Sequence, residues 1–167
     1  MSPLILALAH VAVLAYALVA GVFLAFSDFI MRALSRTSGQ GGAEAMQAIN
    51  REVFRWVFMA LFLGLAAVSL LLVVHAALWL DGAPAALVAA AGIVYLLGCF
   101  AVTVVFNVPM NETLAGMDLS QASTRHYWTG TYLPRWTFWN TARTIACGLA
   151  AALLLAGLAA LSPPPAV

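Results

Sequence analysis

The chain has 167 residues, of which 65% are hydrophobic and only 8% are charged. Soluble proteins carry charge at roughly a quarter of their positions, so a water-soluble globular domain is excluded. The net charge of +1 and the absence of a basic tail argue against nucleic acid as a partner. The length leaves room for about four membrane-spanning helices of ~20 residues each. We therefore predict a small all-α integral membrane protein surrounded by the lipid bilayer.

Four apolar stretches predict a four-transmembrane-helix bundle that forms one membrane domain over residues 1–167. The first stretch lacks a basic leading segment and exceeds the usual length of a secretory signal, so we expect it to be retained. Only Asp81 and Gly82 separate the second and third stretches, which predicts a tight antiparallel hairpin. The predicted spans are about 4–26, 57–80, 83–106 and 142–161, and the longer connections are 27–56 and 107–141.

All positive charge lies on one side of the predicted bundle. The cations are seven arginines without a lysine, and they fall in or beside the two longer connections. The positive-inside rule makes that side cytoplasmic, so both termini and the Asp81 turn are expected to be periplasmic or extracellular. Arginine without lysine, together with abundant alanine, is typical of a GC-rich bacterial genome. We therefore predict a multi-pass protein of the bacterial plasma (inner) membrane.

Helix-breaking prolines predict where helices end, and small residues predict where helices pack. The segment that begins at Ala43 runs without a breaker into the second span, which predicts one helix projecting from the membrane. Pro109 is expected to interrupt the third helix, Pro134 to open the last, and the run 163–165 to end it. Small residues at four-residue spacing predict close helix packing. These are Ala17, Gly21 and Ala25 on the first helix and Gly148, Ala152, Ala156 and Ala160 on the last.

Polar side chains gather at the arginine-bearing ends of the spans. The spacing of Trp136, Asn140 and Arg143 places them on one helix face. Polar groups are costly in hydrocarbon, so we expect this face to turn inward toward Asn107 and Asn111. The alternative is the headgroup zone, where arginines extend to the surface and aromatic rings form a belt. We favour that alternative for Trp128 and Tyr132.

Four strings carry a family resemblance that covers nearly the whole chain. They are GVFLAFSDFIMRAL (21–34), MQAINREVFRW (46–56), NVPMNETLAGMD (107–118) and RWTFWNTART (135–144). The chain resembles the anthrone oxygenase-like integral membrane family, many of whose bacterial members have unknown function. The resemblance implies a four-helix membrane protein that oxidises a hydrophobic, anthrone-like or phenolic substrate with O2 and without a cofactor. The chemistry requires substrate deprotonation and stabilisation of the resulting anion.

Mapped onto this sequence, the resemblance implies three sets of site residues. The anion-stabilising donors are Arg143, Asn140, Asn107 and Asn111. The candidate bases are His126, Glu112 and Glu52. The substrate-binding residues are Trp136, Trp139, Asn50, Phe54 and Phe106.

Two histidines offer a rival site. His10 and His75 lie about 9 and 8 Å from the outer ends of neighbouring spans at the usual helical rise, so they can meet. Together they would hold haem or a metal ion and make a redox protein. Alternatively each makes a hydrogen bond between helices, and no complete metal site is predicted. A non-catalytic lipid- or quinone-binding protein is the third reading. The substrate, the base and the oligomeric state stay open.

Overall fold

The computed structural model of the protein describes residues 1–161, apart from the side chain of Trp56. Four of its helices are long and apolar enough to cross a membrane: Pro3–Ser35, Val57–Trp79, Gly82–Ala115 and Ala122–Leu161. The predicted all-helical, four-span fold is therefore confirmed, and the chain is a multi-pass membrane protein. The proline run 163–165 lies outside the described residues, and the orientation in the membrane stays a prediction.

Three of the four long helices are assembled from shorter elements, most of them joined by π-helical turns. The first span contains α1 (Pro3–Ala25), η1 (Phe26–Ile30) and α2 (Met31–Ser35). After the short helix α3 (Gly41–Glu52), the second span is formed by α4 (Trp56–Trp79). The third contains α5 (Gly82–Tyr95), η2 (Leu96–Ala101), η3 (Thr103–Asn107) and α6 (Val108–Ala115). The last contains α7 (Ala122–Tyr127), η4 (Trp128–Tyr132) and α8 (Leu133–Leu161).

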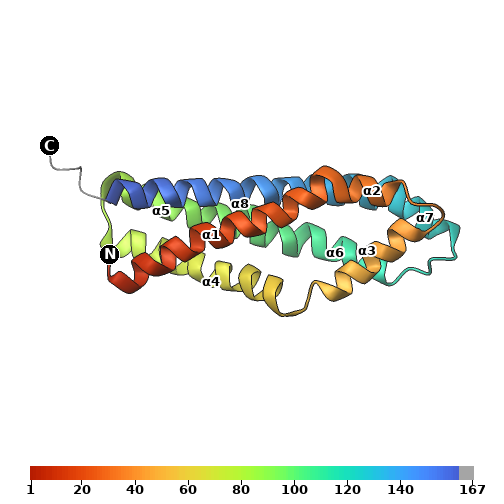
Figure 1. Cartoon of the computed structure of the whole chain (residues 1–167), viewed down its shortest axis with the longest axis horizontal. Coiled ribbons are helices and arrows are strands. Elements are labelled where there is room, and N and C mark those ends of the chain that lie inside the picture. The colour runs from red at the N-terminus through yellow and green to blue at the C-terminus, as the bar shows by residue number, and fades with distance from the viewer. Residues whose placement is uncertain (162–167) are drawn as a thin grey trace.

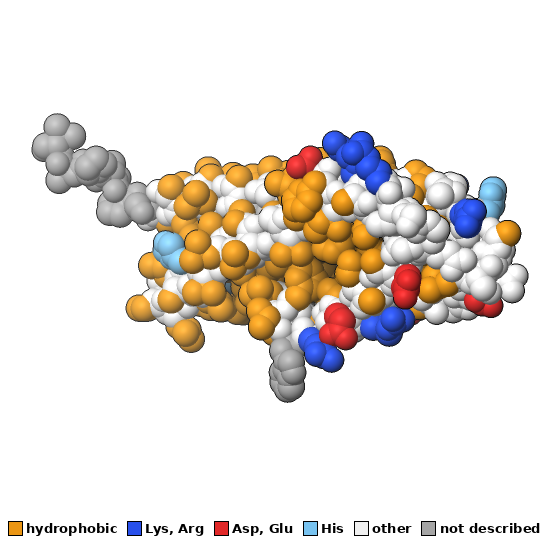
Figure 2. Space-filling view, turned by 45° about the vertical axis from the view of Figure 1, so that its right-hand side comes forward, with side chains coloured by type: hydrophobic (Ala, Val, Ile, Leu, Met, Phe, Trp, Pro, Cys, Tyr) orange, Lys and Arg blue, Asp and Glu red, His pale blue; other side chains and the backbone are white. Residues whose placement is uncertain are grey.

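The bundle is elongated and has two unlike ends (Figure 1). The N-terminus, the last turn of α8 and the α4–α5 hairpin lie at one end, which we call the hairpin end. Elements α2, α3 and α7 lie at the other, which we call the charged end because the arginines gather toward it (Figure 2). Gly82 closes the hairpin with a φ of 65°, in the left-handed region that glycine adopts without strain.

The third helix continues through Pro109, so the predicted interruption there is wrong. Proline lacks an N–H and crowds the carbonyl four residues earlier, which normally breaks a helix. Here η3, the wider π-helical turn at Thr103–Asn107, comes immediately before α6 and takes up that mismatch. A π-helical turn also occurs in the first helix, which continues beyond its predicted end at residue 26 through η1 into α2.

The predicted continuous helix from Ala43 into the second span is also wrong. The helix breaks at Val53–Arg55, and Arg55 has an extended backbone with φ −75° and ψ 141°. The physical reason is that α3 buries a face of its own, which includes Met46 and Gln47, across the charged end. Because α4 runs along the bundle instead (Figure 1), one straight helix cannot make both sets of contacts.

The hairpin half is tightly packed. Tyr16 and Ser69 join α1 to α4 by a 2.6 Å hydrogen bond, and Tyr95 donates to the carbonyl of Phe62 at 2.8 Å. Gly92 permits this approach of α5 to α4, because a Cβ there would lie 2.6 Å from the carbonyl oxygen of Ser69. The free cysteines, Cys99 and Cys147, are buried in this core.

The small-residue stripes do not make the packing faces, and that prediction is wrong. Gly21 and Gly148 are both exposed, and a Cβ at either would have no neighbour within 4 Å. Larger buried residues such as Tyr16 and Leu154 share the buried faces with alanines such as Ala12 and Ala150. Four-residue spacing alone therefore does not distinguish a face that packs from a face that meets lipid.

The charged half opens into a fork. Elements α1 and α4 lie close together toward the hairpin end and separate toward the charged end (Figure 1). A second buried cluster closes the charged end beyond the fork: Met31, Ala43, Met46, Leu114, Trp128, Tyr132 and Trp136. The space between this cluster and the packed hairpin half is where the candidate site lies.

Candidate functional site

A cavity of about 250 Å³ occupies the fork. Its wall comes from α1, α3, α4, α6 and α8 and from the π-helical segments between them, and it is mostly apolar. The polar lining residues are Asn50, Thr103, Asn111 and Arg143. An apolar pocket with a few converging polar groups is the usual form of a small-molecule site.

Arg143 is the dominant group of this cavity. Its side chain is buried, with the residue only 5% exposed. Nη2 donates to Oδ1 of Asn140 at 2.7 Å, Nη1 donates to Oγ1 of Thr103 at 3.2 Å, and Nε is buried without a partner. The guanidinium carbon lies 4.2 Å from the ring centroid of Phe23 and 5.3 Å from that of Trp136.

Within the described part of the chain no carboxylate pairs with Arg143, and the one ion pair joins Arg55 to Glu52 at the surface. The buried cation is thus supported only by neutral dipoles and aromatic faces, which stabilise it less than an anion does. A charge kept at such a cost inside a membrane protein makes Arg143 a candidate functional group, and its positive charge suits an anionic ligand.

Asn140 holds the guanidinium in place from behind. It is fully buried, and its Nδ2 donates to the carbonyl of Phe23 at 2.6 Å and to Oγ of Ser27 at 2.7 Å. The Phe23 carbonyl lies in the last turn of α1, three residues before η1 begins at Phe26. Oδ1 of Asn140 is therefore aimed at Arg143, as the spacing of these two residues predicted.

A second polar chain crosses the charged end of the cavity with a fixed direction. Nε1 of Trp136 can only donate, and it donates to Oδ1 of Asn111 at 2.8 Å. The hydroxyl of Tyr132 donates to the same oxygen at 2.7 Å and accepts from Nδ2 of Asn50 at 3.2 Å. These bonds leave the Asn111 amide nitrogen as a donor and the Asn50 oxygen as an acceptor at the cavity wall.

The remaining predicted donor, Asn107, lies behind the wall. It is 1% exposed, its Nδ2 donates to the carbonyl of Trp136 at 3.3 Å, and its Oδ1 is buried without a partner. The structure thus brings Arg143 and Asn140 together with Asn111 nearby, while Asn107 supports the backbone of α8.

Other predicted site residues lie elsewhere. Phe54 lines the mouth of the cavity, but Phe106 and Trp139 are not among its lining residues; their rings stack on each other with centroids 3.7 Å apart. The aromatic wall consists instead of Phe23, Phe26, Phe58, Phe62, Phe100 and Trp136. The candidate bases His126, Glu112 and Glu52 are exposed and do not line the cavity.

Two polar residues of the site were missed by the sequence analysis. Tyr132 was assigned to an aromatic belt, yet it is fully buried in the chain between Asn50 and Asn111. Its position four residues before Trp136 was the available signal, because it continues the same helix face. Thr103 had a similar signal, lying four residues before Asn107.

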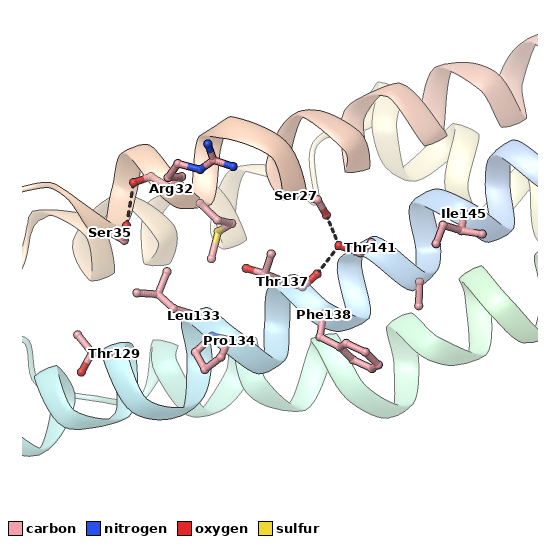
Figure 3. A pocket seen from close by; sticks show the side chains of 12 residues that line it. Ser27, Arg32, Ser35, Thr129, Leu133, Pro134, Thr137, Phe138, Thr141 and Ile145 are labelled. Atoms are coloured by element: carbon pink, nitrogen blue, oxygen red, sulfur yellow. Dashed lines mark hydrogen bonds between the residues drawn. The ribbon is translucent and has the colours of Figure 1, made fainter.

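A surface groove of about 710 Å³ lies on the other side of the contact between η1 and α8 (Figure 3). The hydroxyls of Ser27 and Thr141 are 3.0 Å apart on its floor. Because Asn140 donates to Ser27, one buried amide separates the groove from the guanidinium of the cavity.

Each rival histidine has its named contact within its own helix. Nδ1 of His10 donates to the carbonyl of Leu6 in its own helix at 2.8 Å. His75 stacks on Trp79 with ring centroids 5.3 Å apart, and its Nε2 is buried without a partner. No group of three or more metal-ligating side chains occurs in the residues that the structure describes. Haem or metal binding stays a prediction that an absorption spectrum tests.

Fold and cavity together define a multi-pass helical membrane protein with a buried, unpaired cation facing an apolar chamber. The sequence profile of one family, anthrone oxygenase, matches residues 51–153. The chain therefore belongs to the anthrone oxygenase family, and the match includes Asn111, Trp136 and Arg143. No curated protein and no solved structure matches the chain.

Proposed function

We propose that the protein oxidises a hydrophobic aromatic substrate, an anthrone or a similar phenol, with O2 in the cavity of the fork. The single observation that carries the proposal is the buried guanidinium of Arg143, which faces an apolar chamber and has no carboxylate partner among residues 1–161. Family membership supports the oxygenase chemistry. In this proposal the charged end faces the cytoplasm of a bacterium.

The proposed reaction converts a methylene between two aryl rings into a ketone. A base removes one proton from the methylene, and the delocalised carbanion transfers electrons to O2. A hydroperoxide forms on that carbon, and loss of water leaves the carbonyl group. One substrate molecule and one O2 thus give one quinone and one water, so the electrons come from the substrate and no other reductant is needed.

The cavity residues have separate roles in this sequence of steps. Arg143 stabilises the negative oxygen of the enolate form, and stabilising developing charge is the largest single contribution in many enzymes. The free amide of Asn111 gives a second donor, and the free oxygen of Asn50 accepts a substrate hydroxyl. The phenylalanines exclude water, which strengthens these interactions.

The proton acceptor lies outside the apolar chamber in this proposal. Two of the candidate bases are next to a cavity-lining residue in the chain: Glu52 precedes Val53, and Glu112 follows Asn111. His126 is not, because neither of its chain neighbours lines the cavity. Arg143 lowers the pKa of a bound acidic methylene, so a weak base is sufficient to remove the proton.

An anaerobic titration tests the proposed role of Arg143. An anthrone is bound to the protein in lipid nanodiscs, and the absorbance of its coloured anion is followed against pH. We expect the pKa of the bound anthrone to be lower in the wild type than in Arg143→Met, with Arg135→Met, an exposed arginine, as the matched control. Equal pKa values in wild type and Arg143→Met contradict the proposal.

Isotope incorporation tests the oxygenase step itself. With ¹⁸O2 we expect one labelled oxygen in the new ketone and the other in water. Binding of the anthrone without oxygen uptake above the spontaneous rate would instead make the protein a non-catalytic binder.

A further inference from the structure

We propose that the cavity takes up its ligand sideways from the bilayer, through an opening between α1 and α4. The ligand is then a neutral, membrane-dissolved aromatic molecule that becomes an anion only inside. The identity of the ligand rests on the proposed function, whereas the route rests on the shape of the fork.

The charged end is closed to a ligand from water. The second buried cluster lies between the cavity and that end, with Met46 at 1%, Tyr132 at 0% and Trp136 at 5% exposure. Gln47 fastens this closure by donating to the carbonyls of Leu114 and Met117 at 2.8 and 3.1 Å. The elements of the charged end therefore form a packed roof over the cavity.

The hairpin half closes the opposite direction. Tyr16, Leu72 and Tyr95 are fully buried there, and the Tyr16–Ser69 hydrogen bond holds α1 against α4. A ligand cannot reach the fork along the axis of the bundle from that end.

The side of the fork is open. Val22 on α1, Leu63 on α4 and Phe54 before α4 line the cavity and are 42%, 52% and 67% exposed. Tyr16 faces Ser69, so in antiparallel helices Val22, six residues further along α1, lies level with Leu63, six residues back along α4. Figure 2 shows an apolar hollow on the face between these helices, beside the charged end.

The chemistry of the rim selects the form of the ligand. The named rim residues are apolar, and the nearest charges in the chain, Glu52 and Arg55, neutralise each other at a distance of 2.8 Å. An ionised molecule loses its hydration on passing such a rim, so the neutral form crosses much more readily. Inside the cavity, the guanidinium of Arg143 then favours the anionic form of the ligand. The ligand therefore enters as a neutral molecule and ionises only after it has bound.

Thiol labelling tests the route without any turnover. A cysteine is placed in the cavity by Met59→Cys, in a chain that also carries Cys99→Ala and Cys147→Ala, and the protein is reconstituted in lipid vesicles. Pyrene maleimide, which dissolves in the bilayer, is compared with a sulfonated maleimide supplied on both sides of the membrane. We expect at least roughly hundredfold faster labelling by the neutral reagent, because the sulfonate must lose its hydration. Equal labelling rates by the two reagents overturn the proposed route.

Two variants narrow the opening from opposite helices. Val22→Trp and Leu63→Trp are each expected to slow labelling by pyrene maleimide several-fold. Leu24→Trp is the control, because Leu24 is 54% exposed on α1 and does not line the cavity. Circular dichroism and size-exclusion chromatography identify any variant that misfolds. Unchanged labelling in both folded variants overturns the route.

The two proposals can fail separately. If labelling follows the lateral pattern but no anthrone is oxidised, the route stands and the oxygenase function fails. If the anthrone is oxidised but the sulfonated reagent labels Met59→Cys from water as fast as the neutral one, the function stands and the route fails.

Discussion

The hairpin half and the charged half of the bundle treat buried polar groups differently. In the hairpin half the buried hydroxyls are all satisfied at short range, as in the pair Tyr16–Ser69 and in the bond from Tyr95 to the carbonyl of Phe62. Nε2 of His75 is buried there without a partner, as are Nε of Arg143 and Oδ1 of Asn107 in the charged half. Hydroxyl groups thus join helices in the hairpin half, whereas in the charged half the guanidinium of Arg143 lines a cavity.

Backbone distance explains the difference. Where Gly92 meets Ser69, two helices are close enough for side chains to bond the neighbouring backbone. In the fork, Phe58 and Phe62 extend from α4 toward Phe23 and Phe100, with ring centroids 5.8 and 5.5 Å apart in the two cross-helix pairs. Large rings hold the helices apart but leave space between them, and that space is the cavity.

The largest expected effect separates activity from stability in the charged half. We expect Arg143→Met to lower kcat/KM for anthrone oxidation by roughly 10²–10³-fold, the usual cost of losing one anion-stabilising donor. The free energy of unfolding should change little, because the variant also removes an unpaired buried charge. Oxygen uptake and denaturation in detergent measure the two quantities. A strongly destabilised variant would show that Arg143 is structural.

In the hairpin half the corresponding change affects stability. Gly92→Ala places a Cβ 2.6 Å from both the Ser69 carbonyl oxygen and a methyl of Val73, and we expect a loss of about 1–3 kcal/mol in the free energy of unfolding. Gly64→Ala is the control, since nothing lies within 4 Å of that position and alanine favours the helix. Equal denaturation midpoints for the two variants would contradict the packing argument.

A smaller effect tests the directed hydrogen-bond chain. Tyr132→Phe removes the donor to Asn111 and the acceptor from Asn50, which are 2.7 and 3.2 Å away. We expect the affinity for a hydroxylated anthrone to fall by about tenfold, or ~1.4 kcal/mol. Tyr127→Phe is the matched control, because its hydroxyl makes only a 3.5 Å contact with the carbonyl of Met110. Equilibrium binding without O2 measures both variants.

The smallest effects concern the base. A base in contact with the substrate typically contributes about 10²–10⁴-fold, but Glu52, Glu112 and His126 lie outside the chamber. We therefore expect Glu52→Gln, Glu112→Gln and His126→Gln each to reduce the initial rate of oxygen uptake only a few-fold. A loss of a thousandfold in one of them would identify a base that approaches the substrate directly.

Much of the fold was predictable because hydropathy and length act locally. The two-residue turn at Asp81 and Gly82 forces an antiparallel hairpin whatever the rest of the chain does. The contact between Arg143 and Asn140 followed from three-residue spacing on one helix. These predictions needed no knowledge of how distant helices pack.

The remainder depended on tertiary contacts that a single sequence does not display. The break at Val53–Arg55 arises because α3 packs over the charged end, and no helix breaker marks it. Phe106 and Trp139 have suitable chemistry for a wall but stack on each other outside the cavity. The exposed stripe that contains Gly21 shows that composition gives no sign of which face meets a neighbour.

The hairpin also sets the mechanics of the fork. The short turn at Asp81 and Gly82, where glycine adopts its positive φ without strain, connects α4 to α5 at the end farthest from the cavity mouth. The Tyr16–Ser69 hydrogen bond and the close approach of Gly92 to Ser69 then hold α4 again between this turn and the fork. The segment from Trp56 to Ser69 covers about 20 Å at ~1.5 Å per residue, so the width of the aperture depends on this segment of α4 alone.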